Sequence, residues 1–181
     1  MIIIIGLLFI IFVFDLILHP YLFGPNNKYI NYDPYLIEDN LDKILPNYYF
    51  DMRLLNNYYF LGVISAIVFL LDFNLLKSFL LSRLIRIIAI YLIKIPNPNP
   101  RAHLKRNRIH DLIISGHTIH WNLIFIYFIK NFNWVCYSSL FIILILYYLY
   151  LIKEKHHYSI DIFFGIYVSY TSYLLFENNI L

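Results

Sequence analysis

The sequence has very little cysteine and few charged residues. Cys136 is the only cysteine among its 181 residues, and charged residues make up 14% of the chain. A single cysteine excludes an intramolecular disulfide and a zinc site built from several thiolates. Soluble domains contain roughly 25% charged residues, so this low content indicates that a membrane surrounds the chain. We expect no nucleic-acid partner.

Hydrophobic residues make up 61% of the chain and gather in six long runs. Each run approaches the roughly 17–25 residues that a helix needs to cross the hydrocarbon core of a bilayer. We therefore expect an all-α integral membrane protein, with one domain over residues 1–181 and six transmembrane helices in a compact bundle. The expected helices cover residues 2–18, 58–76, 79–95, 112–128, 134–152 and 158–176. The alternative is a buried globular core, but one soluble domain of this length would have no use for six such runs.

The first run begins at Met1, with no basic segment before it and no small-residue cleavage site after it. These features predict a retained helix rather than a secretory signal. If the helices alternate in direction, the loops near residues 19–57, 96–111 and 153–157 all lie on one face of the membrane.

Two short polar strings stand at the starts of the fourth and sixth runs. The first is Ser115–Thr118, with the sequence SGHT, and the second is His157–Asp161, with the sequence HYSID. One further run separates them, so both strings emerge on the same side of the membrane. Two histidines and a carboxylate can therefore meet there.

These residue types suit phosphoryl transfer. His157 and Asp161 are four residues apart, so they share one helix face, where the carboxylate can accept Nδ1–H and leave the other nitrogen as a nucleophile. His117 follows Ser115 and Gly116 at a helix start, where backbone N–H groups and the helix dipole favour a phosphate oxygen. A second histidine there can protonate the leaving oxygen and later deprotonate the acceptor.

The two strings also have a purely structural interpretation. The pair of His157 and Asp161 would anchor a helix end at the interface, and His117 would be an ordinary polar residue at a helix start. Because ionisable residues at membrane depth are costly, their presence together favours function.

The two strings resemble the two best-known motifs of the sphingomyelin synthases, six-helix relatives of the lipid phosphate phosphatases. The resemblance implies a lipid-phosphatase-like core and a catalytic triad of His117, His157 and Asp161. Asp111 precedes His117 by six residues, and Arg86 precedes the Pro96–Pro98 stretch by ten, both as in the family. We therefore expect substrate binding by four further residues, Ser115, Gly116, Arg86 and Asp111.

Other segments support or depart from this resemblance. Residues 45–51 look like the family's Leu-Pro-Asp segment, although Asn47 replaces its aspartate. Ile109 and His110 stand where the family usually has Cys-Gly. Ten helical residues place Arg86 roughly 15 Å below Pro96, about halfway through the hydrocarbon, where an arginine needs a partner or a wet cavity. Arg83 is expected to extend to the opposite surface.

The resemblance implies a phosphotransferase that moves a phosphoryl headgroup, phosphocholine by resemblance, from a glycerophospholipid to ceramide and releases diacylglycerol. The alternative is a lipid phosphate phosphatase of the phosphatidate type. Lys94 and Arg101 have the spacing of that family's first motif, but Ala102 replaces its proline, and Leu151 stands where its third motif has an arginine. Since that arginine holds a dianionic phosphomonoester, its absence favours the transferase.

Two other functional classes fit the sequence less well. His117 with His120, and His156 with His157, look like fragments of the histidine boxes of membrane di-iron enzymes. The chain has only seven histidines and no compensating carboxylate cluster, so we expect no metal and no cofactor. A non-catalytic scaffold or transporter is the remaining class, and the intact triad argues against it.

Orientation rests on opposing signals. Most basic residues fall in the loops on the face of the two strings, which by the positive-inside rule would be cytoplasmic. The family places its site on the lumenal or exoplasmic face, and we follow the family because the same loops are also rich in acidic residues. We expect a multi-pass protein of the Golgi, endoplasmic reticulum or plasma membrane, whose partners are the bilayer and its substrate lipids. The sequence leaves open the oligomeric state and the choice among choline, ethanolamine and inositol headgroups.

Overall fold

The computed structural model describes residues 39, 41, 44–45, 52–93, 114–154, 156–178 and 180. The helices within these described residues are α3 (Tyr58–Leu71), α4 (Phe73–Leu92), α6 (Gly116–Asn131), α7 (Trp134–Lys153) and α8 (Ser159–Glu177). No strand occurs within these described ranges, so the predicted all-helical fold is confirmed for them. The first predicted helix, at residues 2–18, lies outside the described residues.

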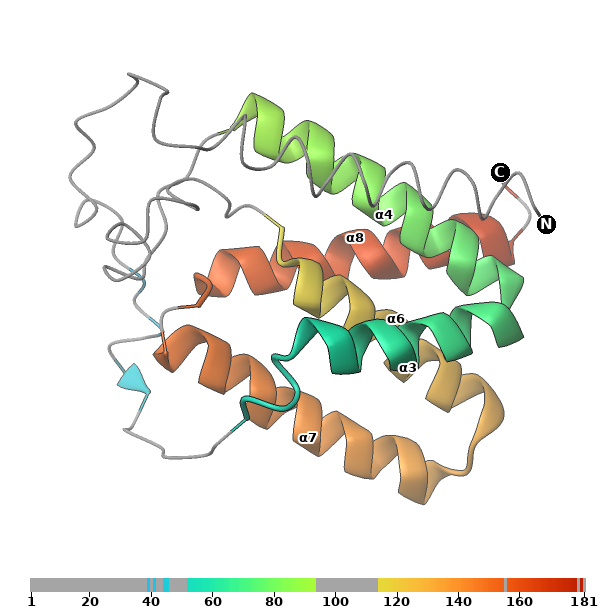
Figure 1. The fold of residues 1–181 in the computed structure, drawn as a ribbon, viewed down its shortest axis with the longest axis horizontal. Coiled ribbons are helices and arrows are strands. Elements are labelled where there is room, and N and C mark those ends of the chain that lie inside the picture. Colours follow the sequence, from blue (N-terminus) through green and yellow to red (C-terminus); the bar gives the residue numbers. More distant parts are fainter. Residues whose placement is uncertain are drawn as a thin grey trace.

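Helix α6 lies at the centre of the arrangement and contacts each of the other four helices. Helices α4 and α8 pack against each other and against one side of α6, while α3 and α7 lie toward its other side (Figure 1). Helices α3, α6 and α8 begin at one end of the bundle, and α4 and α7 finish there (Figure 1). We call this end the histidine end, because His117 and His157 lie at it.

The apolar core forms around α6. The side chains of Ile119, Leu123 and Ile124 in α6 are almost completely buried. Tyr147 and Leu151 of α7 are completely buried beside them. Fully burying side chains of this size stabilises a fold by about 1.5–3 kcal/mol each, so α6 is the element on which the bundle depends.

The structure corrects the predicted position of the break between the second and third helices. The sequence predicts helices over 58–76 and 79–95, but α3 ends at Leu71 and α4 begins at Phe73. The reason is Asp72, whose Oδ1 accepts hydrogen bonds from the backbone N–H groups of Asn74 and Leu75. Aspartate is a favoured N-cap residue, so a new helix begins after it even within an apolar run.

The fourth predicted helix is also displaced along the chain. It was expected over 112–128, whereas α6 covers Gly116–Asn131. Ser115 caps α6, because its Oγ accepts a hydrogen bond from the backbone N–H of Thr118. The start of the SGHT string is therefore the helix cap, and its glycine and histidine form the first turn.

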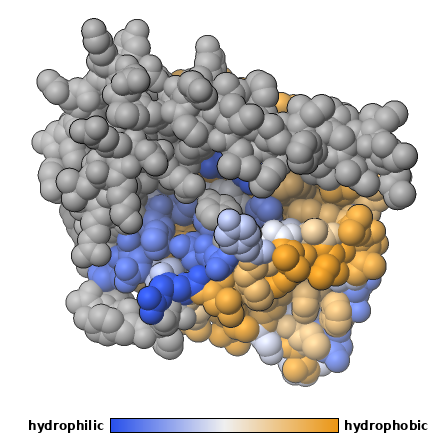
Figure 2. All heavy atoms as spheres, viewed as in Figure 1, coloured by the Kyte–Doolittle hydropathy of each residue, from blue (hydrophilic) through white to orange (hydrophobic). Residues whose placement is uncertain are grey.

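Two of the described helices, α7 and α8, are long and apolar enough to cross a membrane, and most of their residues are not fully buried. Large exposed apolar side chains include Phe141, Ile142, Phe163 and Tyr167. Figure 2 shows hydrophobic residues over much of the described part of one face, with hydrophilic residues gathered toward the end where α3 begins. Such a surface is unusual for a soluble monomer and is consistent with membrane association. The six-span topology stays a prediction.

Candidate active site

The starts of α6 and α8 touch at the histidine end. The backbone N–H of Ser115 donates a hydrogen bond of 3.1 Å to the carbonyl oxygen of Asp161. Gly165 lies one turn further along α8, and a methyl group placed on it would lie 2.8 Å from Cβ of Thr118. The absence of a side chain at Gly165 therefore permits the close approach that brings the SGHT and HYSID strings together.

The two predicted catalytic histidines lie side by side. The ring centroids of His117 and His157 are 6.3 Å apart, with an angle of 67° between the ring planes. Both side chains are largely buried, with His117 6% exposed. At this separation both imidazoles can act on one small group without touching each other, as a pair of acid–base and nucleophilic groups must.

Asp161 lies beside His157 but does not form a hydrogen bond with it. Oδ2 of Asp161 is 3.6 Å from Nδ1 of His157, which is too long for a hydrogen bond. The same oxygen accepts a hydrogen bond of 2.9 Å from the backbone N–H of Tyr158 at the start of α8. The predicted pair of residues four apart is therefore an electrostatic contact, and Asp161 also caps its helix.

The hydrogen bond that caps α8 uses one oxygen of Asp161, and two buried atoms of the Asp161 and His157 pair take no part in it. The side chain of Asp161 is completely buried. Within the described residues, its Oδ1 and Nδ1 of His157 have no hydrogen-bond partner. Buried polar atoms without partners cost stability, and catalytic hydrogen bonds are often long until the substrate binds.

Two arginines lie against the first turn of α6. A methyl group placed on Gly116 would lie 3.1 Å from Nη1 of Arg83 and 3.6 Å from Nε of Arg86. Arg86 is buried, and its Nε donates a hydrogen bond of 2.9 Å to the carbonyl oxygen of Ile114, just before the SGHT string. This contact gives the buried guanidinium of Arg86 a hydrogen-bond partner.

The expectation that Arg83 extends to the opposite surface is wrong. Its guanidinium lies over the ring of Phe79 at 5.4 Å and reaches the start of α6. The physical reason is that Arg83 and Arg86 are three residues apart on α4, so both project from the face that packs on α6. That spacing was the available signal for this residue.

The neighbouring histidines have other surroundings. Nδ1 of His120 lies 2.8 Å from Oγ of Ser65, and its ring packs on Phe79 with the centroids 4.6 Å apart. His156 packs beside Tyr150, with the ring centroids 5.8 Å apart. Burial lowers the pKa of His156, and the adjacent His157 lowers that pKa further. Of the two adjacent histidines, His157 is the one that lies against both His117 and Asp161.

The segment just before α3 borders the histidine pair. Nε2 of His117 lies 3.2 Å from the carbonyl oxygen of Asn56. The indole N–H of Trp121 donates to the carbonyl oxygen of Leu55, and the hydroxyl of Tyr147 donates to Oδ1 of Asn56. Sequence reasoning did not identify these contacts, because nothing in residues 55–56 marks them as neighbours of a histidine 61 positions later.

The last expected substrate-binding residue, Asp111, lies outside the described residues. In the parts of the chain that are described, no three histidine, cysteine, aspartate or glutamate residues form a group that could hold a metal ion. The expectation of a metal-free reaction stays a prediction.

The comparisons with known proteins concern the segment that contains this site. Residues 110–179 match the family model of the PAP2 superfamily C-terminal domain. No curated protein and no solved structure matches the chain. The matched segment contains α6, α7 and α8, and with them His117, His157 and Asp161. The match supports the lipid phosphatase and phosphotransferase superfamily and, with it, an enzyme that acts on phosphoryl groups of membrane lipids.

Proposed function

We propose that this protein is a sphingomyelin synthase-like phosphotransferase. It would move a phosphoryl headgroup, phosphocholine first among the candidates, from a glycerophospholipid to ceramide. The observation that carries the proposal is the pair of His117 and His157, 6.3 Å apart at one end of the bundle with Asp161 buried beside them. A nucleophile, an acid–base group and an orienting carboxylate are the parts that a covalent phosphoryl transfer needs.

The first half-reaction transfers the headgroup to the enzyme. Nε2 of His157 attacks phosphorus and forms a P–N bond, while the bond from phosphorus to the diacylglycerol oxygen breaks. His117 gives its proton to that leaving oxygen. The charge of Asp161, 3.6 Å from Nδ1 of His157, stabilises the positive imidazolium.

The second half-reaction returns the enzyme to its starting state. Ceramide enters from the bilayer, and its primary hydroxyl loses a proton to His117. The hydroxyl oxygen attacks phosphorus as the P–N bond to His157 breaks. The headgroup leaves on ceramide, His117 is protonated again, and the route is a ping-pong mechanism.

Phosphate binding in this proposal belongs to the first turn of α6. Ser115 caps that turn, and the guanidinium groups of Arg83 and Arg86 lie against Gly116. Backbone N–H groups at a helix start and guanidinium donors are both good ligands for phosphoryl oxygens. Asp111 keeps its place in the proposal through the family resemblance alone.

A lipid phosphate phosphatase is the second candidate, and Arg83 is the observation that favours it. Leu151, where the phosphatase motif has an arginine, is completely buried among apolar side chains. Arg83 nevertheless adds a second cation beside Arg86, and two cations suit a dianionic phosphomonoester. The same site can therefore serve hydrolysis if water replaces ceramide as the acceptor.

The deciding experiment supplies the purified full-length protein with headgroup-labelled phosphatidylcholine, with and without ceramide. We expect labelled phosphocholine to appear on ceramide only when ceramide is present, with release of diacylglycerol. The variant His157→Ala is the control for contaminating activity. Release of inorganic phosphate from phosphatidate, without any headgroup transfer, would assign the protein to the phosphatases. Transfer from phosphatidylinositol or phosphatidylethanolamine alone would change the headgroup and leave the mechanism standing.

We further propose a multi-pass topology with the histidine end on the lumenal or exoplasmic face. Glycosylation sites introduced singly within residues 26–42 and near Asn178 test this arrangement, since only a lumenal site is modified. We expect modification within 26–42 alone. Modification near Asn178 alone would place the histidine end in the cytosol.

A further inference from the structure

We propose that Asn56 and Tyr147 are positioning residues that fix His117 in one tautomer, with Nε2 protonated and Nδ1 facing the chemistry. This inference rests on the proposed function, because it assigns the proton transfer to a specific nitrogen of His117. It concerns two residues outside the two motifs, one in the segment before α3 and one in the middle of α7.

The first step is the contact between His117 and the main chain. Nε2 of His117 lies 3.2 Å from the carbonyl oxygen of Asn56. A carbonyl oxygen has no hydrogen to give, so Nε2 must carry the proton in this contact. In a neutral imidazole only one nitrogen carries hydrogen, and Nδ1 is therefore the basic nitrogen. Nδ1 is the atom that takes the proton of the acceptor hydroxyl and returns it to a leaving oxygen.

The second step is what holds that carbonyl in place. The hydroxyl of Tyr147, a completely buried residue, donates a hydrogen bond of 3.1 Å to Oδ1 of Asn56. The indole N–H of Trp121 donates one of 3.1 Å to the preceding carbonyl, that of Leu55. Trp121 lies one turn after His117 on the same face of α6, so two rings of one helix hold two consecutive carbonyls.

The third step is the consequence of this arrangement. The main-chain carbonyl of Asn56 orients His117, and the side chain of the same residue is held by Tyr147. Loss of the Tyr147 hydroxyl frees the Asn56 side chain and lets the carbonyl move away from Nε2. His117 then distributes between two tautomers, and only one of them presents a basic Nδ1. None of these groups needs to touch the lipid, so the effect falls on kcat rather than on KM.

The matched pair of variants is Tyr147→Phe and Tyr148→Phe. Each removes one buried hydroxyl from α7, but within the described residues the Tyr148 hydroxyl has no hydrogen-bond partner. For headgroup transfer by the full-length protein, we expect Tyr147→Phe to lower kcat about tenfold with little change in KM, part of the 100-fold or more that general acid–base catalysis supplies. Tyr148→Phe should stay within about twofold of the wild type.

A second variant guards against a folding defect in the first. Asn56→Leu keeps the backbone carbonyl and the size of the side chain but removes the acceptor of the Tyr147 hydroxyl. It should lower kcat to a similar extent, and the double variant should be hardly worse than either single one, because both changes break one contact. Additive losses, or a normal kcat in both single variants, would overturn the proposal.

A spectroscopic measurement reads the tautomer without any need for activity. Nitrogen-15 spectra of histidine-labelled protein in detergent, recorded at a pH high enough to keep His117 neutral, distinguish a protonated Nε2 from a protonated Nδ1, and His117→Gln identifies the signal. We expect the Nε2–H tautomer in the wild type and in Tyr148→Phe, and a mixture in Tyr147→Phe. A wild-type signal from the Nδ1–H tautomer would overturn this inference even if headgroup transfer is found. The expected tautomers in a protein that transfers no headgroup would leave the positioning intact and reject the proposed function.

Discussion

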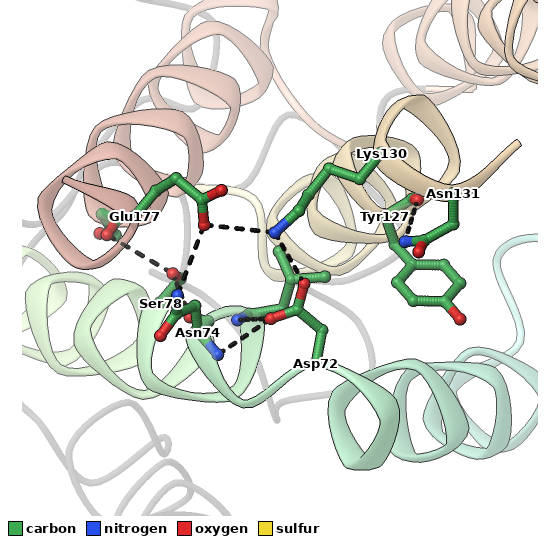
Figure 3. Close-up of polar contacts among 9 residues, drawn as sticks. Asp72, Asn74, Ser78, Tyr127, Lys130, Asn131 and Glu177 are labelled. Atoms are coloured by element: carbon green, nitrogen blue, oxygen red, sulfur yellow. Dashed lines mark hydrogen bonds and ion pairs between the residues drawn. The ribbon is translucent and has the colours of Figure 1, made fainter. Parts of the chain in front are cut away.

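The two ends of the described bundle both carry clusters of polar and charged side chains. The two clusters differ in whether these side chains have hydrogen-bond and ion-pair partners. At the end opposite the histidines, Nζ of Lys130 lies 3.0 Å from Oδ2 of Asp72 and 3.2 Å from Oε2 of Glu177 (Figure 3). Asn74 donates to Glu177, and Oδ1 of Asp72 caps α4. We call this group the Lys130 cluster. Its three charged side chains are partly exposed, and each has a partner.

The histidine end has the opposite character. Asp161 is completely buried, its Oδ1 and Nδ1 of His157 lack hydrogen-bond partners among the described residues, and two guanidinium groups lie against Gly116. A cluster that only holds helices together pairs its charges near water, as the Lys130 cluster does. Buried polar atoms that stay unpaired reduce stability and persist where they serve binding or chemistry. The comparison therefore favours a structural role for the Lys130 cluster, and it supports the proposal that the reaction takes place at the histidine end.

We expect the largest effect on headgroup transfer from substitution of either histidine or of the aspartate. His117→Ala, His157→Ala and Asp161→Asn should each lower headgroup transfer by on the order of 10³-fold or more, because the three act as one unit. A double variant should be hardly worse than a single one. Activity measurements on folded, membrane-inserted protein check this.

The control for these variants is the adjacent histidine. His156 packs on Tyr150 rather than on Asp161, so His156→Ala should lower activity only a few-fold. If His156→Ala were as inactive as His157→Ala, the choice of nucleophile would be wrong.

The next effect concerns the arginines against the first turn of α6. Arg83→Gln should lower activity by about 10–100-fold, since a charge-assisted contact to phosphate contributes about 1.5–3 kcal/mol. Lys77→Gln is the matched control, because Lys77 belongs to the same helix but lies over the rings of Phe73 and Phe176. Equal losses in both variants would mean that the charge of α4 acts on the fold rather than on the substrate.

A smaller effect is expected from the contact that joins the two motifs. Gly165→Ala places a methyl group 2.8 Å from Cβ of Thr118, and such overpacking costs about 1–3 kcal/mol. It should lower the unfolding temperature and activity together, because it pushes the SGHT and HYSID strings apart. Gly62→Ala is the control, since a methyl group there meets nothing within 4 Å. Equal destabilisation by both substitutions would show that α6 and α8 do not need this close contact.

The sequence could predict those features that depend on periodicity and spacing. Hydrophobic runs indicated the helices, and the two polar strings at run starts indicated one shared end. The break at Asp72 was missed because the apolar run continues past it, and a cap outweighs hydrophobicity there. The role of the Asn56 carbonyl could not be predicted, because every residue has a carbonyl and only packing brings this one to Nε2 of His117. The position of Arg83 could be predicted only in part. Its spacing from Arg86 was visible in the sequence, but the sequence did not show which face of α4 packs on α6.

The smallest effect is expected at the Lys130 cluster, and it is the sharpest test of the comparison. Lys130→Met keeps an unbranched side chain and removes two ion pairs whose side chains are 15–37% exposed. Ion pairs with this access to water contribute at most about 1 kcal/mol each, and salt weakens them. We therefore expect a small fall in the unfolding temperature that shrinks in high salt, with headgroup transfer within about twofold of the wild type. Thermal unfolding at low and high salt, with activity assayed on the same samples, measures both. A loss of transfer comparable to that of Arg83→Gln, in a protein that still unfolds near the wild-type temperature, would mean that the Lys130 end also takes part in the reaction.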